Sequence, residues 1–125
     1  MTLRVHVGTD LVTISRIDAM TVKGGRDWLE SIWTAQELAY SELRPDRLAT
    51  RWAAKEATIK ALGLGIGRIE PIDIEIVSTS GAAPSLRLSA SAERRASEMK
   101  VTSMSVSLSH ERDLALAYVA LLAEE

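Results

Sequence analysis

The amino-acid sequence predicts an α+β protein, in which early helices pack on an antiparallel sheet within a single compact domain that spans residues 1–125. Two observations lead to this fold class. Apolar residues recur at helical spacing through most of the first half of the chain, whereas the second half changes to the alternation that is typical of strands. An alternating stretch also opens the chain, so we expect the first strand to join the sheet formed by the later strands.

The first half of the chain is predicted to hold one strand followed by helices. The alternation in LRVHVG, residues 3–8, predicts a strand, and Asp10 follows where this strand should end. Helices are expected from residue 13 to the glycines of 23–25, around residues 28–32, from 34 to 44 and from 45 to 62. Thr34 and Glu37 fit a capping box, and Gly63 is placed to end the last of these helices.

The second half is predicted to consist mainly of strands. Residues 72–77, 85–89 and 103–109 alternate as strands do, and residues 91–100 read as a helix. The stretch LALAYVALL, residues 114–122, is ambiguous because Leu and Ala also favour helices. We expect a strand there, because a strand leads into the four-residue turn HERD and pairing back across that turn is the simplest arrangement.

Composition excludes several classes of protein. The chain has no cysteine, which excludes disulfides and thiolate metal sites and suits a reducing compartment. Its 15 basic and 17 acidic residues give a net charge of −2, without the basic excess of general nucleic-acid binders. No segment is long and apolar enough to span a bilayer, and no signal-peptide pattern opens the chain. We therefore expect a cytoplasmic protein that binds neither nucleic acid nor membrane.

The segment RWAAKEATIKALGLGIG, residues 51–67, concentrates charge on a helix that runs into glycines. Glu56 and Lys60 are four residues apart and therefore share a helix face. The simplest interpretation is an exposed ion pair worth about 0.3–0.5 kcal/mol. Trp52 lies on the same face, however, which argues against a face that is fully exposed to solvent.

A site for a polyphosphate and its metal ion is the second interpretation. Arg51, Lys55 and Lys60 surround the single carboxylate of Glu56, and the GLGIG stretch offers backbone N–H groups that can approach a phosphate. Mg²⁺ usually takes one or two protein carboxylates and fills its remaining positions with phosphate oxygens and water. Asp10, after the first strand, is the best candidate for a second carboxylate.

Four blocks of the sequence, in order, resemble those of the short 4′-phosphopantetheinyl transferases, the holo-acyl-carrier-protein synthase type. These blocks are VGTDLVTISRI, WTAQELAY, RWAAKEATIKALGLGIG and the closing VSLSHERDLALAYV. The resemblance covers nearly the whole chain. Trp33 and Trp52 stand where the family usually has Phe, which enlarges two core positions and suggests a shifted pocket.

The resemblance implies a reaction in which coenzyme A donates its phosphopantetheine arm to a serine of an apo acyl carrier protein, releasing adenosine 3′,5′-bisphosphate. It implies that Asp10 and Glu56 hold Mg²⁺ on the diphosphate. Lys60 would contact that diphosphate and either stabilise charge in the transition state or protonate the leaving group. Such chemistry depends on neutralised charge and positioned reactants. Either Glu56 or a metal-bound hydroxide would take the serine proton.

The resemblance also implies residues for the nucleotide. Arg51, Lys55 and His110 would lie near the nucleotide and its 3′-phosphate, and Gly63 and Gly65 would shape its pocket. On the local sequence alone, His110 is better explained as a polar turn residue within SHERD.

Partners are implied in the same way. Arg16 would meet an acidic helix of the carrier protein, although it could equally be an ordinary surface charge. The family implies a homotrimer with coenzyme A between neighbouring protomers. Two other functions stay open: a non-catalytic module that binds coenzyme A and carrier proteins, and another nucleotide-diphosphate transferase that uses the same Mg²⁺ site.

Overall fold

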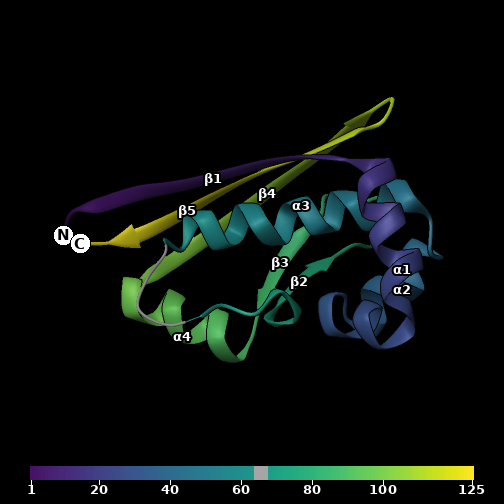
Figure 1. Ribbon diagram of the computed structural model, residues 1–125. Coiled ribbons are helices and arrows are strands. Elements are labelled where there is room, and N and C mark those ends of the chain that lie inside the picture. The colour runs from purple at the N-terminus through teal and green to yellow at the C-terminus, as the bar shows by residue number, and fades with distance from the viewer. Residues whose placement is uncertain (64–67) are drawn as a thin grey trace.

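A three-stranded antiparallel sheet crossed by one long helix forms the centre of the structure (Figure 1). The computed structural model describes residues 1–63 and 68–125. The strands are β1 (Leu3–Thr13), β4 (Val101–Glu111) and β5 (Leu114–Glu124), in the spatial order β1-β5-β4. The predicted pairing of the first strand with the late strands is confirmed, as is the strand expected in the ambiguous stretch before the C-terminus.

The strands are longer than the sequence predicts. Asp10 lies inside β1 rather than at its end, directly opposite Ala117 of β5. β4 likewise continues into the predicted HERD turn, and Arg112 in that turn has a left-handed backbone with φ of 54°. The alternation of apolar and polar residues shows where this strand begins. Thr9 and Asp10 point to opposite faces of the strand and are both polar, so the alternation stops there and does not show that the strand continues.

Three helices follow β1. They are α1 (Ile14–Ile32), α2 (Ala35–Ser41) and α3 (Pro45–Ala61). α1 is interrupted at Gly25, where φ is 73° and ψ is −169°, so the predicted break at KGG is a kink within a longer helix. The predicted capping box is present at α2: the Glu37 N–H donates to the Thr34 hydroxyl, and the Thr34 N–H donates to the Glu37 carboxylate.

The second half of the chain adds a smaller layer beside α3. β2 (Ile74–Val77) and β3 (Ser85–Leu88) form a separate two-stranded sheet, preceded by the short 3₁₀ helix η1 (Pro71–Asp73) and followed by α4 (Ala90–Met99). The one antiparallel sheet expected from the sequence is therefore divided in two. The alternation of a strand identifies its buried face but not the sheet that it joins.

α3 presents a face of small residues to the sheet. Ala53, Ala57 and Ala61 are buried there, four residues apart. Gly8 of β1 lies directly on this face, because a Cβ at residue 8 would be only 1.9 Å from the carbonyl oxygen of Ala57. Only glycine fits at that distance. The strand and the helix thus cross at backbone contact, which brings Asp10, two residues further along β1, close to the C-terminal half of α3.

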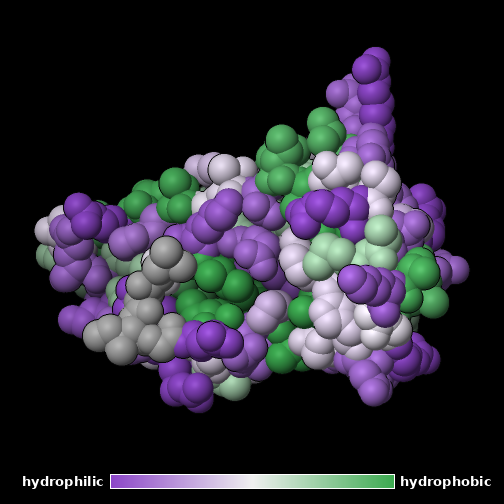
Figure 2. Space-filling view, viewed as in Figure 1, coloured by the Kyte–Doolittle hydropathy of each residue, from purple (hydrophilic) through white to green (hydrophobic). Residues whose placement is uncertain are grey.

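The face of the main sheet that points away from α3 is apolar and exposed. β1 and β5 supply this outer face, with Leu3, Val5, Val7, Leu11, Leu114, Leu116 and Tyr118. Figure 2 shows hydrophobic patches along the side of the molecule where the sheet lies. Contiguous apolar surface of this kind marks an interaction site. Within the described ranges, no helix has both the length and the apolar character needed to cross a membrane.

Candidate active site

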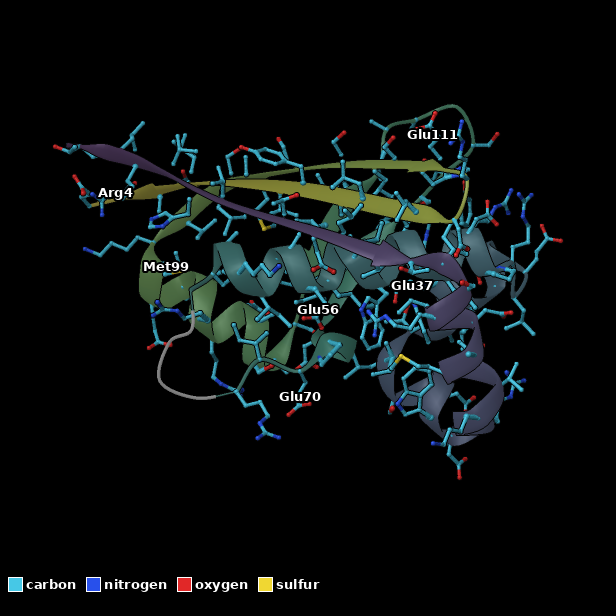
Figure 3. The ribbon with its side chains drawn as sticks, turned by 45° about the horizontal axis from the view of Figure 1, so that its top comes forward. Arg4, Glu37, Glu56, Glu70, Met99 and Glu111 are labelled. Atoms are coloured by element: carbon cyan, nitrogen blue, oxygen red, sulfur yellow. The ribbon has the colours of Figure 1, made fainter. Side chains whose placement is uncertain are left out.

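Asp10 and Lys60 meet where β1 crosses the C-terminal half of α3. The Lys60 ammonium donates to Asp10 Oδ1 at 3.1 Å and to the carbonyl oxygen of Thr9 at 2.9 Å. Glu56 lies one helical turn before Lys60 on the same face of α3 and is half-buried (Figure 3). The structure therefore brings three predicted site residues, Asp10, Glu56 and Lys60, to one edge of the sheet.

The charges at this edge are not balanced. Lys60 is paired with Asp10 rather than with Glu56, so the simple ion pair on one helix face is not the arrangement found. Burial raises the pKa of the Glu56 carboxyl, and the nearby Asp10 raises it further, while Lys60 opposes them. Two carboxylates with one ammonium are short of positive charge, which favours binding of a cation.

A divalent ion at this edge would need ligands from outside the protein. Among the described residues there is no group of three or more His, Cys, Asp or Glu that could hold a metal. Asp10 and Glu56 together supply the one or two carboxylates that Mg²⁺ usually takes, with substrate oxygens and water filling the other positions. The donor set therefore fits Mg²⁺ bound jointly with a phosphorylated substrate.

Lys55 does not belong to this charged group. Its side chain is 1% exposed, and its ammonium donates to Glu37 Oε1 at 2.7 Å and to the carbonyl oxygens of Ile74 and Pro71 at 2.5 and 3.1 Å. This burial contradicts the prediction that Lys55 is one of the cations around Glu56, and it leaves no free N–H for a nucleotide. A lysine four residues from Arg51 looked exposed in sequence, but that face of α3 packs against α2 and β2.

Arg51 lies one helical turn before Lys55 on α3 and lines a pocket away from Asp10 and Lys60. The residue is only 5% exposed; its guanidinium donates to the Ser78 hydroxyl at 2.7 Å and lies 4.8 Å from the centre of the Tyr40 ring. Its Nε is buried without a hydrogen-bond partner among the described residues. Burial also lowers the pKa of Arg51. A buried donor without a partner is costly, so the pocket is suited to an anion that would accept from it.

His110 lies in the same pocket, together with residues that the sequence reasoning missed. The walls are Tyr40, Arg44, Asp46, Arg47, Thr50, Arg51, Leu108 and His110. His110 Nε2 is 3.9 Å from Asp46 Oδ2, and the Arg47 guanidinium lies 5.1 Å from the Tyr40 ring centre. The sequence does indicate that Arg44 and Arg47 lie near Arg51, because residues 44, 47 and 51 are spaced three and four apart, as residues on one helix face are.

The two charged sites open at opposite edges of the sheet. Lys60 reaches β1, whereas the pocket of Arg51 is walled by Leu108 and His110 of β4. Arg51 and Lys60 are separated by about 13 Å along the axis of α3, from the rise of 1.5 Å per residue. β5 lies between β1 and β4, so the two sites lie at separate edges of the sheet.

The remaining predicted residues lie elsewhere. Arg16 is exposed on α1, where its guanidinium donates to the Met20 sulfur at 3.8 Å. Gly63 follows α3 with φ of 75°, the left-handed conformation expected after a helix end. Gly65 lies outside the described residues.

Comparison with known proteins identifies relatives along nearly the whole chain. The family described as the 4′-phosphopantetheinyl transferase superfamily matches residues 6–119. A holo-[acyl-carrier-protein] synthase of Desulfovibrio desulfuricans is 40% identical over 119 residues, which cover 94% of this chain and 96% of that protein.

Solved structures share the fold. The holo-[acyl-carrier-protein] synthase of Helicobacter pylori, in complex with coenzyme A, superposes with a TM-score of 0.82 at 30% identity and covers 92% of this chain and 98% of its own. The acyl carrier protein synthase of Mycobacterium tuberculosis gives a TM-score of 0.76 at 34% identity and covers 95% of this chain and 97% of its own.

Proposed function

The chain belongs to the 4′-phosphopantetheinyl transferase superfamily, and on that premise we propose which of its residues carry out the transfer. Its activity is that of a holo-[acyl-carrier-protein] synthase, an enzyme of fatty-acid biosynthesis that moves phosphopantetheine from coenzyme A to an apo acyl carrier protein. Mg²⁺, the residue roles, the trimer and a cytoplasmic location are proposals.

The observation that carries the proposal is the convergence of Asp10, Glu56 and Lys60 at the crossing of β1 and α3. Asp10 and Glu56 would hold Mg²⁺ together with the diphosphate of coenzyme A. When bound, the ion supplies positive charge and Lewis acidity to the diphosphate oxygens. Lys60 is half-exposed and can turn from Asp10 toward the same diphosphate once the ion satisfies the carboxylate.

The chemistry is the transfer of one phosphoryl centre between two oxygens. The serine oxygen of the carrier attacks the phosphorus that bears the pantetheine, and the bond from that phosphorus to the bridging oxygen breaks. The leaving group is adenosine 3′,5′-bisphosphate, whose new charge the Lys60 ammonium neutralises. Either Glu56 or a water molecule beside it would take the serine proton in this scheme.

The pocket of Arg51 would bind the 3′-phosphate of coenzyme A. The buried Nε of Arg51 needs an acceptor, and phosphate offers several. Arg44, Arg47 and His110 line the same space and add positive charge or donors. Dephospho-coenzyme A lacks only this phosphate. The Michaelis constant for coenzyme A should therefore rise in Arg51→Met, whereas that for dephospho-coenzyme A should barely change.

The placement of the two sites supports assembly of several copies, which we propose to be a homotrimer. The diphosphate and the 3′-phosphate belong to one small molecule, yet their proposed sites open at opposite edges of the sheet. A contact between the β1 edge of one copy and the β4 edge of the next would unite them, and such a contact of two unlike surfaces gives a ring when its rotation closes. The exposed apolar outer face of the sheet would be buried at the centre of that ring.

Arg16 is proposed to contact the acidic surface of the carrier protein, because it is exposed on α1.

The test is the intact mass of an apo carrier protein after incubation with the protein, coenzyme A and Mg²⁺. A gain of one phosphopantetheine arm, lost with a chelator and in Glu56→Gln, would support the proposal. Carrier binding without any gain in mass, unchanged in Glu56→Gln, would favour the non-catalytic binding module instead.

A further inference from the structure

The buried ion pair between Glu37 and Lys55 lies directly beneath the pocket of Arg51. Lys55 is one helical turn after Arg51 on α3, and Glu37 is three residues before Tyr40 on α2. The same two helices therefore meet twice. They meet once through the buried ion pair, and again one turn further on, where the Arg51 guanidinium lies 4.8 Å from the Tyr40 ring.

The pair holds three elements together with every polar atom engaged. The three N–H groups of Lys55 donate to Glu37 and to the carbonyl oxygens of Pro71 and Ile74. Glu37 accepts from Lys55 and the Thr34 N–H through Oε1, and from the Ile76 N–H at 2.9 Å through Oε2. The start of α2, the middle of α3 and the strand β2 are thus joined at one point.

β2 carries this connection to the pocket of Arg51. Ser78 directly follows β2, and its hydroxyl accepts from Arg51 at 2.7 Å. The Arg51 guanidinium also donates to the Thr50 hydroxyl and the Arg47 carbonyl oxygen, which belong to α3 itself. Its two contacts outside α3, with the Tyr40 ring and the Ser78 hydroxyl, belong to segments that Glu37 and Lys55 fix against α3. An ion pair with hydrogen bonds to all its atoms resists displacement, because breaking it leaves a buried charge unpaired.

We propose that Glu37 and Lys55 are positioning residues for the 3′-phosphate pocket: they fix α2 and β2 on α3 so that the Arg51 guanidinium points into that pocket. This inference rests on the proposed function of the pocket. Substitution of Glu37 distinguishes this positioning role from direct binding of the nucleotide by Lys55, because the Glu37 side chain is fully buried and cannot reach a nucleotide.

The experiment measures the Michaelis constants for coenzyme A and for dephospho-coenzyme A in Glu37→Gln and Lys55→Met. Both variants should raise the constant for coenzyme A by about tenfold, the loss of one charged hydrogen bond, and leave that for dephospho-coenzyme A nearly unchanged. The turnover number at saturating coenzyme A should change little, because Asp10, Glu56 and Lys60 are not disturbed.

Leu121→Ala is the matched control, because Leu121 is buried in β5 opposite His6 and Met104 and is not among the residues that line the pocket of Arg51. It should lower the melting temperature while keeping the preference for coenzyme A over dephospho-coenzyme A. If Glu37→Gln resembles this control, the positioning role is wrong. If only Lys55→Met changes the preference, Lys55 binds the nucleotide directly. If Arg51→Met also keeps the preference, the proposed pocket itself is wrong.

Where a variant does not fold, the milder Lys55→Arg serves in its place. Its bulkier head keeps the charge but cannot repeat the same three contacts, so the same loss of preference is expected. A Lys55→Arg protein with the full preference for coenzyme A would overturn the inference.

Discussion

Gly8→Ala tests the backbone contact that positions Asp10. An added Cβ would lie 1.9 Å from the Ala57 carbonyl oxygen and 2.8 Å from the Ala61 nitrogen, both of them backbone atoms that cannot rotate away. To regain an ordinary contact of about 3.5 Å, β1 would have to move from α3 by more than about 1 Å. Asp10 is two residues away and would move with the strand, away from Lys60 and Glu56.

Two measurable effects follow from that displacement. Overpacking of this kind costs about 1–3 kcal/mol of unfolding free energy, which urea denaturation followed by tryptophan fluorescence would record. A misplacement of about 1 Å in a catalytic site lowers rates by about 100-fold. The transfer rate at saturating coenzyme A should fall by that order, and the Mg²⁺ concentration for half-maximal activity should rise.

Gly81→Ala is the matched control for Gly8→Ala. Gly81 has φ of 79° and open space at its Cβ position, so the change costs only about 1–2 kcal/mol of backbone strain. Its Mg²⁺ dependence should equal that of the unchanged protein. A Gly8→Ala protein with normal Mg²⁺ dependence and normal activity would show that the contact does not position Asp10.

Three further predictions concern charge, assembly and the carrier. The pKa of Glu56 in the folded protein is raised above its ordinary 4.5, so ionisation of Glu56 destabilises the fold as the pH rises from about 4.5 through the raised pKa. Without Mg²⁺, Glu56→Gln should therefore raise the melting temperature at pH 7 and should not raise it below about pH 4.5. A rise in melting temperature at pH 4 equal to that at pH 7 would contradict this. Val5→Glu on the outer face should convert the proposed trimer to monomers, as measured by light scattering, whereas an unchanged mass would mean that this face is not the interface. Arg16→Glu should raise the Michaelis constant for the carrier by about tenfold without altering that for coenzyme A, and equal changes in both would assign Arg16 elsewhere.

The sequence predicted the features that depend on local pattern. The capping box at Thr34, the extent of α3 and the alternating strands were all readable, because each depends on residues within a few positions of one another. The small-residue face around Ala57 permits the close approach of a neighbouring backbone, but nothing in the local sequence identifies Gly8 as that neighbour.

The features that depend on packing between distant segments were not readable. Lys55 looked like a surface cation beside Glu56, because its partner Glu37 is 18 residues away and its carbonyl acceptors lie in a later segment. The Tyr40 ring contacts the Arg51 guanidinium only because α2 and α3 pack against each other. The division of the strands into two sheets likewise depends on tertiary contacts and not on alternation.

The most direct test of a site shared between copies mixes two impaired variants. Glu56→Gln removes the proposed metal side of the site, and Arg51→Met weakens the nucleotide side. If one active site is assembled from the β1 edge of one copy and the β4 edge of the next, random trimers formed by unfolding and refolding an equal mixture should regain about one quarter of the intact sites. The readout is the rate at which the apo carrier gains phosphopantetheine at low coenzyme A. Activity of about one quarter of the unchanged protein is predicted, and activity no greater than the average of the two variants would contradict a site shared between copies.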